Sequence, residues 1–348
     1  MRVEEALIFM FSPAVDFVEP SYRGGTSRPS HASSLSEEDL TGADRALLQL
    51  GRKLRQREYR FTTITPRSHR TVLARPRTKA PTLQDIFGWS RPFAEEELAP
   101  DILHELSEAQ ALQGSGTKLR SAIRFSTLGD QIFAHSAFPT EQGDSVFFGP
   151  DTYRFARALR QLIDTLPSRP MHILDVGAGS GAGGLSAAAL LPNPPVVLTD
   201  INRNALRLSR INAVLNDIPN VRIVESDLYA NVDGPFDLII SNPPYLVDPL
   251  ARLYRHGGGT LGFELSLQIA LQGLEHLAGG GLLFLYTGSA IVDGVDALHE
   301  SLRERLRGRP VRFTYEEIDP DVFGEELENP PYDRADRIAV VAATIAVA

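Results

Sequence analysis

The segment Asn242-Pro243-Pro244-Tyr245 holds the side chains whose types and spacing point most directly to chemistry. Two consecutive prolines cannot continue sheet pairing, so they fix a stiff loop after the apolar run 238–241. The Asn242 amide and the Pro243 carbonyl each offer an acceptor oxygen, and Tyr245 offers a flat aromatic face. A planar –NH2 group could stack there with both of its hydrogens accepted. We therefore predict these three as catalytic residues for a reaction at nitrogen.

The chemistry that this segment allows is mainly positioning plus electrostatics. A planar nitrogen is a weak nucleophile because its lone pair is delocalised. Acceptors on its hydrogens return electron density to the nitrogen and align it with an electrophile. The reaction then requires no strong general base, and the sequence supplies no obvious one.

A glycine-rich turn follows another apolar run. After Asp175, the glycines Gly177, Gly179 and Gly181 let the backbone approach a ligand closely where a strand turns into a helix. The start of that helix presents free N–H groups to a carboxylate or a phosphate. The same residues, with Ala182 in the third position, also satisfy the dinucleotide fingerprint, so a nicotinamide enzyme stays open at this point.

Two further acids follow later apolar runs. Asp200 comes after the run 196–199, and Asp227 comes after the run 221–224, with Leu228 next to it. A carboxylate at 200 can take both hydroxyls of a ribose, and one at 227 can accept from an adenine amine. The alternative for each acid is a helix N-cap or a turn. Because successive parallel strands end at one edge of a sheet, the series favours a nucleoside-like ligand there.

The elements that must position these residues alternate along the second half of the chain. Seven strands are expected at 173–176, 196–199, 221–224, 238–241, 282–286, 311–316 and 338–345. Helices are expected among them at 152–166, 204–215 and 265–277. Such alternation predicts an α/β fold with a doubly wound, seven-stranded, mostly parallel sheet that helices cover on both faces.

Residues 145–345 resemble a class I methyltransferase that uses S-adenosylmethionine (SAM) as cofactor. The Asn-Pro-Pro-Tyr segment resembles the HemK branch of release-factor glutamine methyltransferases and related amino-methyltransferases. The resemblance implies a last strand that runs antiparallel. The segment 146–152 is similar to the one ahead of the family's first helix, which places Thr152 near the amino-acid part of SAM or near the target. The implied SAM-binding residues are Thr152, Asp175, Gly177, Gly179 and Gly181 at the methionine part, Asp200 at the ribose, and Asp227 and Leu228 at the adenine.

The first 140 residues show a different pattern of expected elements. Helices are expected at 43–59 and 99–112, and a hairpin at 121–136, which together look like a small α+β, winged-helix-like domain. The helical N-terminal bundle of HemK-like enzymes is not seen. The expected division is 1–42 as an N-terminal segment and flexible linker, 43–140 as a substrate or interaction domain, and 145–348 as the methyltransferase domain.

The stretch 254–262 also bears on the substrate. It is rich in glycine and resembles the substrate-side loop of ribosomal RNA amino-methyltransferases, which leaves the acceptor open between a protein glutamine and a nucleobase. His256 within it could touch substrate or could simply be exposed.

Charge is distributed unevenly along the chain. The segment 52–79 holds ten basic residues against Glu58, so it sums to +9 while the whole chain carries −9. Such a block can receive a nucleic-acid or protein substrate, or it can be a solvated face. The acidic stretch 316–328 could bind a metal or a cationic substrate, although a solvated loop is the simpler interpretation.

Composition excludes several classes of site and of location. The chain has no cysteine, which rules out disulfides, thiolate nucleophiles and cysteine–zinc sites. The histidines show no zinc spacing, so no metal is expected. No apolar run approaches a membrane span and the first residues make a poor secretory signal, so we expect a cytoplasmic protein that does not associate with membranes.

Several functions fit these observations. The leading interpretation is a SAM-dependent N-methyltransferase acting on a planar amide or amino nitrogen in a macromolecule, such as a protein glutamine. An exocyclic amine of RNA or DNA is the first alternative, because of the basic segment 52–79. A small molecule from a biosynthetic pathway is another. A SAM-binding regulator without activity, with the front domain as its output, is the alternative outside enzymes.

Overall fold

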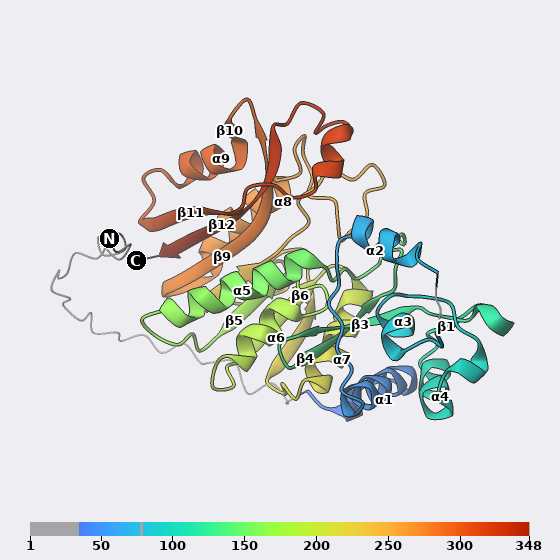
Figure 1. The fold of residues 1–348 in the computed structure, drawn as a ribbon. Coiled ribbons are helices and arrows are strands. Elements are labelled where there is room, and N and C mark those ends of the chain that lie inside the picture. The colour runs from blue at the N-terminus through green and yellow to red at the C-terminus, as the bar shows by residue number, and fades with distance from the viewer. Residues whose placement is uncertain (1–34, 77–78, 348) are drawn as a thin grey trace, which may run out of the picture. The chain divides into compact units, whose positions relative to one another are not determined.

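The computed structural model describes residues 35–76 and 79–347 (Figure 1). Within it, Ser34–Ala348 forms one compact unit. The expectations for residues 1–34, most of the N-terminal segment and linker, lie outside the described residues, as does Arg77 of the basic segment. No helix in the described ranges is both long enough and apolar enough to cross a membrane.

One large sheet carries the second half of the chain. Across the sheet the strands follow the order β11 (Val311–Asp319), β12 (Arg337–Val347), β9 (Leu277–Val292), β8 (Phe236–Ser241), β5 (Ile173–Val176), β6 (Val196–Asp200) and β7 (Val221–Glu225). The strand β12 runs antiparallel to both of its neighbours, and the pairs β9–β8, β8–β5, β5–β6 and β6–β7 are parallel. The predicted doubly wound, mostly parallel sheet with an antiparallel last strand is confirmed. A two-residue strand, β10 (Val295–Asp296), is added beside β9.

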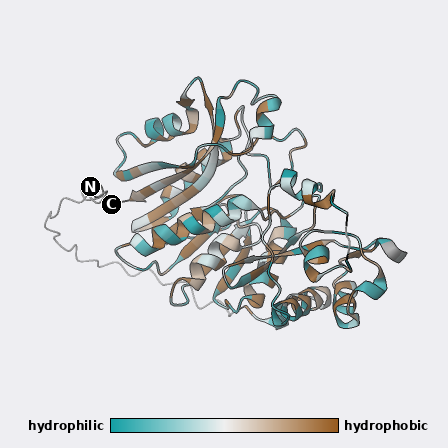
Figure 2. Ribbon diagram, viewed as in Figure 1, coloured by the Kyte–Doolittle hydropathy of each residue, from teal (hydrophilic) through white to brown (hydrophobic). Residues whose placement is uncertain are grey.

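Alternate residues of the strands face two separate hydrophobic cores. In β8, Leu238 and Ile240 pack with helices α5 (Pro150–Thr165) and α6 (Ala182–Ala189). Ile239 faces the other way, toward helices α8 (Glu264–Gly273) and α9 (Ala297–Leu306) (Figure 1). A strand buried on both faces needs mostly apolar residues, and the sequence has them at β5, β6 and β8 (Figure 2).

The region before residue 140 combines short helices with a hairpin. It contains α1 (Gly42–Gln56), α2 (Pro66–Leu73), α3 (Leu83–Phe87), α4 (Pro100–Glu108), the short pair β1 (Leu112–Gln113) and β2 (Arg120–Ser121), and the hairpin strands β3 (Ile123–Leu128) and β4 (Gln131–Ser136). Both predicted helices and the hairpin are present. The helices α2 and α3 were not expected from the sequence, because five to eight residues show too little periodicity.

The core of this front region extends to helix α7 (Arg203–Leu215), which connects β6 and β7 of the large sheet. The side chains of Leu47, Leu50 and Leu54 on α1 belong to one hydrophobic cluster with residues of α7. The buried Asn212 on α7 binds both backbone groups of Ala134: its Oδ1 accepts from the Ala134 N–H at 2.8 Å and its Nδ2 donates to the Ala134 carbonyl at 3.0 Å. The hairpin is thereby fixed to the large sheet by both apolar and polar contacts.

Candidate functional site

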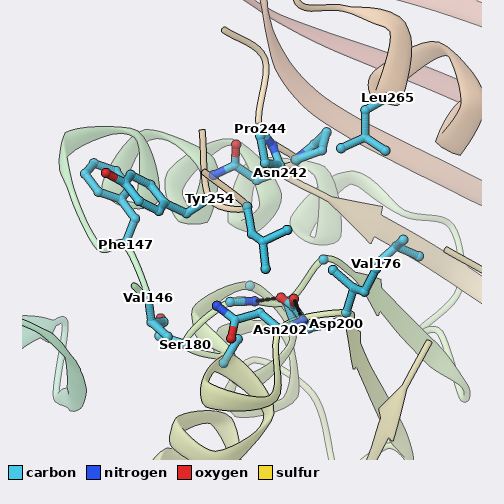
Figure 3. Close-up of a pocket in the computed structure, with 18 of the residues that line it drawn as sticks. Val146, Phe147, Val176, Ser180, Asp200, Asn202, Asn242, Pro244, Tyr254 and Leu265 are labelled. Carbon is cyan, nitrogen blue, oxygen red and sulfur yellow. Dashed lines mark hydrogen bonds between the residues drawn. The ribbon is translucent and has the colours of Figure 1, made fainter. Parts of the chain in front are cut away.

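A cavity of about 240 Å³ opens at the carboxyl ends of β5, β6, β7 and β8 (Figure 3). It gathers residues from segments that lie far apart in the sequence. Of the predicted site residues, those that line it are Thr152, Asp175, Gly177, Gly179, Asp200, Asp227, Leu228, Asn242, Pro243 and Tyr245. This edge is where a doubly wound sheet binds its ligands, since the strand ends and the helix starts converge there.

The glycine-rich turn leaves open space beside its backbone. Gly177 and Gly179 have φ values of 71° and 58°, a region that favours glycine, and a Cβ on either would meet no atom within 4 Å. Gly181 differs and does not line the cavity. Its Cβ would lie 3.1 Å from the Leu185 side chain and 3.2 Å from that of Leu198, so this glycine serves close packing at the start of α6. The implied contact of Gly181 with a ligand is therefore not seen.

Two buried acids hold the turn in place. Asp175 Oδ2 accepts from the Gly184 N–H at 2.7 Å, and burial raises the pKa of Asp175 to about 7, with the Asp200 charge adding to the rise. Asp200 Oδ2 accepts from the Gly179 N–H at 2.9 Å and Oδ1 from the Asn202 N–H at 2.8 Å. Burial also raises the pKa of Asp200, while these backbone hydrogen bonds oppose that rise. Each carboxylate therefore positions backbone at the rim of the cavity.

The third acid is free to bind a ligand. Asp227 is exposed, and its carboxylate has no hydrogen-bond or ion-pair partner among residues 35–76 and 79–347. Its neighbour Leu228 has a φ of 50°, a strained value for a residue with a side chain. Both line the cavity at the end of β7.

Asn242 directs an unpaired amide into the cavity region. The residue is half-buried, and its side chain has no hydrogen-bond partner within the described part of the chain. Figure 3 shows the amide directed to the side where the rings of Phe147 and Tyr254 lie. Those two rings are stacked, with centroids 6.1 Å apart and an interplanar angle of 11°. The Asn242 amide and an aromatic wall thus share one end of the cavity.

The expectation for the ring of Tyr245 needs correction. Tyr245 is buried: its ring lies so close to Gly288 that a Cβ there would be 2.2 Å away, and it meets Phe323 edge-on at 5.8 Å. Its hydroxyl donates to Asp151 Oδ2 at 2.6 Å. The ring therefore supports the loop from within, and the cavity-lining aromatic rings on the side to which Asn242 points are those of Phe147 and Tyr254.

The first turn of α5 contributes a carboxylate that the sequence did not single out. Asp151 is buried against the cavity, where burial raises its pKa, and the Tyr245 hydroxyl and Arg154 act in the opposite direction. Thr152 next to it is also buried, and its Oγ1 accepts from the Gly149 N–H at 3.2 Å. In the sequence, Asp151 looks like an ordinary acid in the first turn of a helix, and only the fold brings Tyr245 to it.

The glycine-rich stretch 254–262 folds back onto the Asn-Pro-Pro-Tyr loop. The Leu246 N–H donates to the Arg255 carbonyl at 3.2 Å, and the Gly257 N–H donates to the Leu246 carbonyl at 2.8 Å. His256 does not line the cavity; its Nδ1 accepts from the Asp248 N–H at 3.1 Å. Tyr254 and Arg255 line the cavity, and these two were missed because histidine drew attention as the reactive type.

Ion pairs neutralise much of both charged segments. Of the nine basic residues in 52–79 that the structure describes, seven pair with carboxylates: Arg52, Lys53, Arg55, Arg57, Arg60, Arg67 and Arg70. Residues of the acidic stretch 316–328 pair with arginines from elsewhere, through Glu317, Asp319, Glu325 and Glu326. The acidic stretch thus has compensating bases after all, brought to it by the fold.

Comparisons with known proteins agree with this geometry. Residues 152–288 match the family model of the methyltransferase small domain. A release factor glutamine methyltransferase of Deinococcus radiodurans is 37% identical over 127 residues, which are 33% of this chain and 44% of that relative. Residues 152–288 are therefore similar to a methyltransferase domain. The chain also resembles the ribosomal RNA small subunit methyltransferase C of Vibrio cholerae, at 28% identity over 130 residues, 37% of this chain and 35% of the relative.

The similarity covers only part of each protein. The chain spans less than half the length of these two relatives. Among solved structures, a ribosomal protein L11 methylase from Lactobacillus delbrueckii subsp. bulgaricus is 20% identical, with a TM-score of 0.39, over 56% of this chain and 80% of the other. The family model covers β5, β6, β7, β8 and most of β9, and it leaves out β11, β12 and the front region before residue 152.

The cavity has the features that SAM would need. Open space beside the Gly177 and Gly179 backbone leaves room for a close approach, as the amino-acid part of SAM needs. The carboxylate of Asp227 is free to accept hydrogen bonds at the other end. A nucleoside with an amino-acid tail requires acceptor groups and an open glycine backbone along one cavity.

Proposed function

We propose that this chain transfers the methyl group of SAM to a planar amide or amino nitrogen of a macromolecule, and that the acceptor is a glutamine-like amide of a protein. The observation that carries the proposal is the unpaired amide of Asn242 beside the Pro243 carbonyl in the same cavity as the glycine turn. A half-buried amide without a partner is free to serve a ligand. Similarity to the release factor glutamine methyltransferase supports the choice of an amide.

In the proposed reaction, SAM supplies an electrophilic methyl group on a sulfonium when it is bound. The Asn242 oxygen and the Pro243 carbonyl accept the two hydrogens of the substrate –NH2, while the Phe147–Tyr254 wall flanks its plane. The substrate nitrogen would supply the electron pair for the new bond to carbon, the sulfur of SAM would be the leaving group, and the nitrogen would release one proton to water. Positioning and removal of water supply the rate enhancement.

The remaining roles follow the same division of the cavity. The residues assigned to the methionine part of SAM are Thr152, Asp175, Gly177 and Gly179, with Asp200 at the ribose and Asp227 and Leu228 at the adenine. Tyr245 acts through Asp151 by holding the Asn-Pro-Pro-Tyr loop. We assign residues 145–348 to catalysis and residues 43–140, whose hairpin is fixed to α7, to substrate recognition.

Substitution of Asn242 tests the mechanism. Asn242→Ala should lower methyl transfer by about 100-fold or more, because one of two acceptors that orient the nitrogen is lost. SAM affinity, measured by calorimetric titration, should stay within a factor of about two, since Asn242 holds the acceptor and not the cofactor. Asn220→Ala, at a half-buried asparagine just before β7 and outside the cavity, is the matched control. Unchanged turnover in Asn242→Ala would refute the mechanism.

The class of acceptor needs a separate experiment. Labelled SAM and the purified protein would be incubated with extract of a strain that lacks the gene, and the label followed into protein, RNA and small molecules. Label in a protein band that acid hydrolysis returns as methylamine identifies an N-methylated amide. Label confined to small molecules would contradict a macromolecular acceptor.

An exocyclic amine of RNA is the second candidate, favoured by the similarity to ribosomal RNA methyltransferase C and by the stacked aromatic pair at Asn242. If RNA is the substrate, binding should weaken steeply as salt rises. The exposed Arg67 and Arg70, which share Glu325, are the basic residues to neutralise. Their double change to Gln should weaken RNA binding and leave SAM affinity alone, and salt-independent activity would exclude this candidate.

A further inference from the structure

A second, smaller polar cavity lies under the hairpin. Its walls include the hydroxyls of Thr63 and Ser136, the ring of Phe138 and the buried guanidinium of Arg124 on β3. We refer to it as the Arg124 cavity. Its volume is about 20 Å³, which is room for one or two water-sized atoms.

Arg124 carries a buried positive charge with almost nothing to balance it. The residue is 4% exposed, and its Nη2 donates to Thr63 Oγ1 at 3.2 Å. Its Nε is buried without any acceptor, and no carboxylate in residues 35–76 or 79–347 forms an ion pair with it. The face of Phe61, 5.6 Å from Cζ, gives weak compensation. Burial lowers the pKa of Arg124 to about 10, so the group still carries its charge at neutral pH.

The hydroxyls near Arg124 cannot supply the missing acceptors. Arginine can only donate, so the Thr63 hydroxyl accepts from it and passes its own hydrogen to Ser126 Oγ, 2.6 Å away. Ser126 then donates to His135 Nε2 at 2.8 Å, and His135 Nδ1 donates to the Ser136 carbonyl at 3.1 Å. Burial and the Arg124 charge hold the pKa of His135 well below its usual range, which fits this neutral form. Each acceptor in this series of hydrogen bonds already accepts one from a neighbour in the series.

A buried, unpaired cation is expensive to keep, by several kcal/mol. Proteins retain such groups where a ligand completes the pair. The free Nε of Arg124 and the open volume at the same place meet that description. The missing partner must be negative, must accept hydrogen bonds and must be small.

We propose that the Arg124 cavity binds a carboxylate, and that in catalysis this carboxylate is an acidic side chain of the protein substrate close to the methylated amide. The volume of about 20 Å³ suits the two oxygens of a carboxylate better than the four of a phosphate. Val146 and Phe147 line both cavities, so one substrate segment can reach both. The identity of the substrate group rests on the proposed function; the anion site itself does not.

The anion site is tested first without substrate. Thermal unfolding of the full chain would be followed in sodium formate against sodium gluconate, a carboxylate too bulky for the cavity, at equal ionic strength and with saturating S-adenosylhomocysteine. Formate should raise Tm by about 2 °C or more in the wild type, because a ligand that binds only the folded state stabilises it. Arg124→Met should lose this rise, whereas Arg160→Met, at an exposed position on α5, should keep it.

Each outcome of the thermal unfolding experiment either supports or overturns the proposal. Absence of a formate response in the wild type overturns the proposal, even if Arg124→Met does not fold. An equal response in a folded Arg124→Met variant also overturns it. If that variant fails to fold, Arg124→Lys replaces it and must show a smaller response than the wild type. Stronger stabilisation by inorganic phosphate than by formate would overturn the assignment to a carboxylate.

Peptides then test the substrate group. Glutamine peptides with one Glu placed at successive distances from the target, and matched peptides with Gln in place of that Glu, would be assayed for methylation. At one distance the acid should lower KM about tenfold in the wild type and not in Arg124→Met, since uniform binding changes KM alone. A positive formate response with no peptide methylated leaves the anion site standing and places the failure in the proposed function. Methylation that ignores the acid at every distance overturns the substrate assignment.

Discussion

Asp175 gives a pH dependence whose size follows from the structure. Its carboxyl is buried beneath the first turn of α6, and its pKa rises from an ordinary 3.8 to about 7 in the folded chain. A raised folded pKa means that the folded state holds the proton longer than the unfolded state does. The associated stability is therefore complete below about pH 4 and is lost as pH rises toward 7. A shift of about three pKa units corresponds to about 4 kcal/mol.

The variant Asp175→Asn removes this titration. Its amide oxygen can still accept from the Gly184 N–H, while no charge has to be buried. Relative to the wild type, the unfolding free energy of the variant should therefore increase by about 4 kcal/mol between pH 4 and pH 8. For Asp164→Asn, at an exposed site on α5, the difference in unfolding free energy from the wild type should not change with pH.

The measurement is urea unfolding at a series of pH values, followed by circular dichroism and by the fluorescence of Trp89, the single tryptophan. Coincident transitions from the two probes establish that the free energies are meaningful. A difference between variant and wild type that stays constant with pH, or that shrinks as pH rises, would refute the reasoning about Asp175.

Three other substitutions test the remaining contacts. Asn212→Ala should lower the unfolding free energy by about 3 kcal/mol in urea, because three buried backbone groups lose their partner; equal stability would contradict it. Gly257→Ala places a Cβ 1.9 Å from the Gly262 carbonyl oxygen, so methyl transfer should fall at least about tenfold with SAM affinity kept, whereas Gly279→Ala, in open space, should be silent. Tyr245→Phe should destabilise by about 2 kcal/mol at pH 8 and by less as pH falls through the raised pKa of Asp151, because a protonated Asp151 needs no donor; the reverse order would rule this out.

The fold was largely predictable because strands that are buried on both faces have a mostly apolar sequence, which can be recognised. The strands β5, β6 and β8 are mostly apolar, and a glycine turn, an acid or a proline pair follows each at the same edge. In the sheet, the strand ends were missed: β9 extends from Leu277 to Val292, beyond the apolar run 282–286. Pairing with β12 continues to Ile291, and a sequence pattern does not record it.

The residues of the site could largely be predicted from the sequence, whereas the contacts between their side chains could not. Aspartates and glycines at strand ends can be located from spacing alone. The burial of Tyr245 could not be, since it depends on Asp151, which lies 94 residues away in the sequence. The pairing of Arg55 with Asp217 and of Arg70 with Glu325 is equally remote, so a segment that looks basic in the sequence is largely neutral in the fold.

Asn212 joins two places that the proposed reaction uses. The same side chain that holds the backbone of Ala134 in the hairpin also donates to the Ser180 carbonyl at 2.9 Å, in the glycine turn. A substrate that displaces the hairpin must therefore alter the free energy of the turn that SAM would contact. By thermodynamic linkage, SAM must change the affinity for that substrate by the same factor as the substrate changes the affinity for SAM. The coupling between the two affinities would then pass through one amide side chain that lines neither cavity.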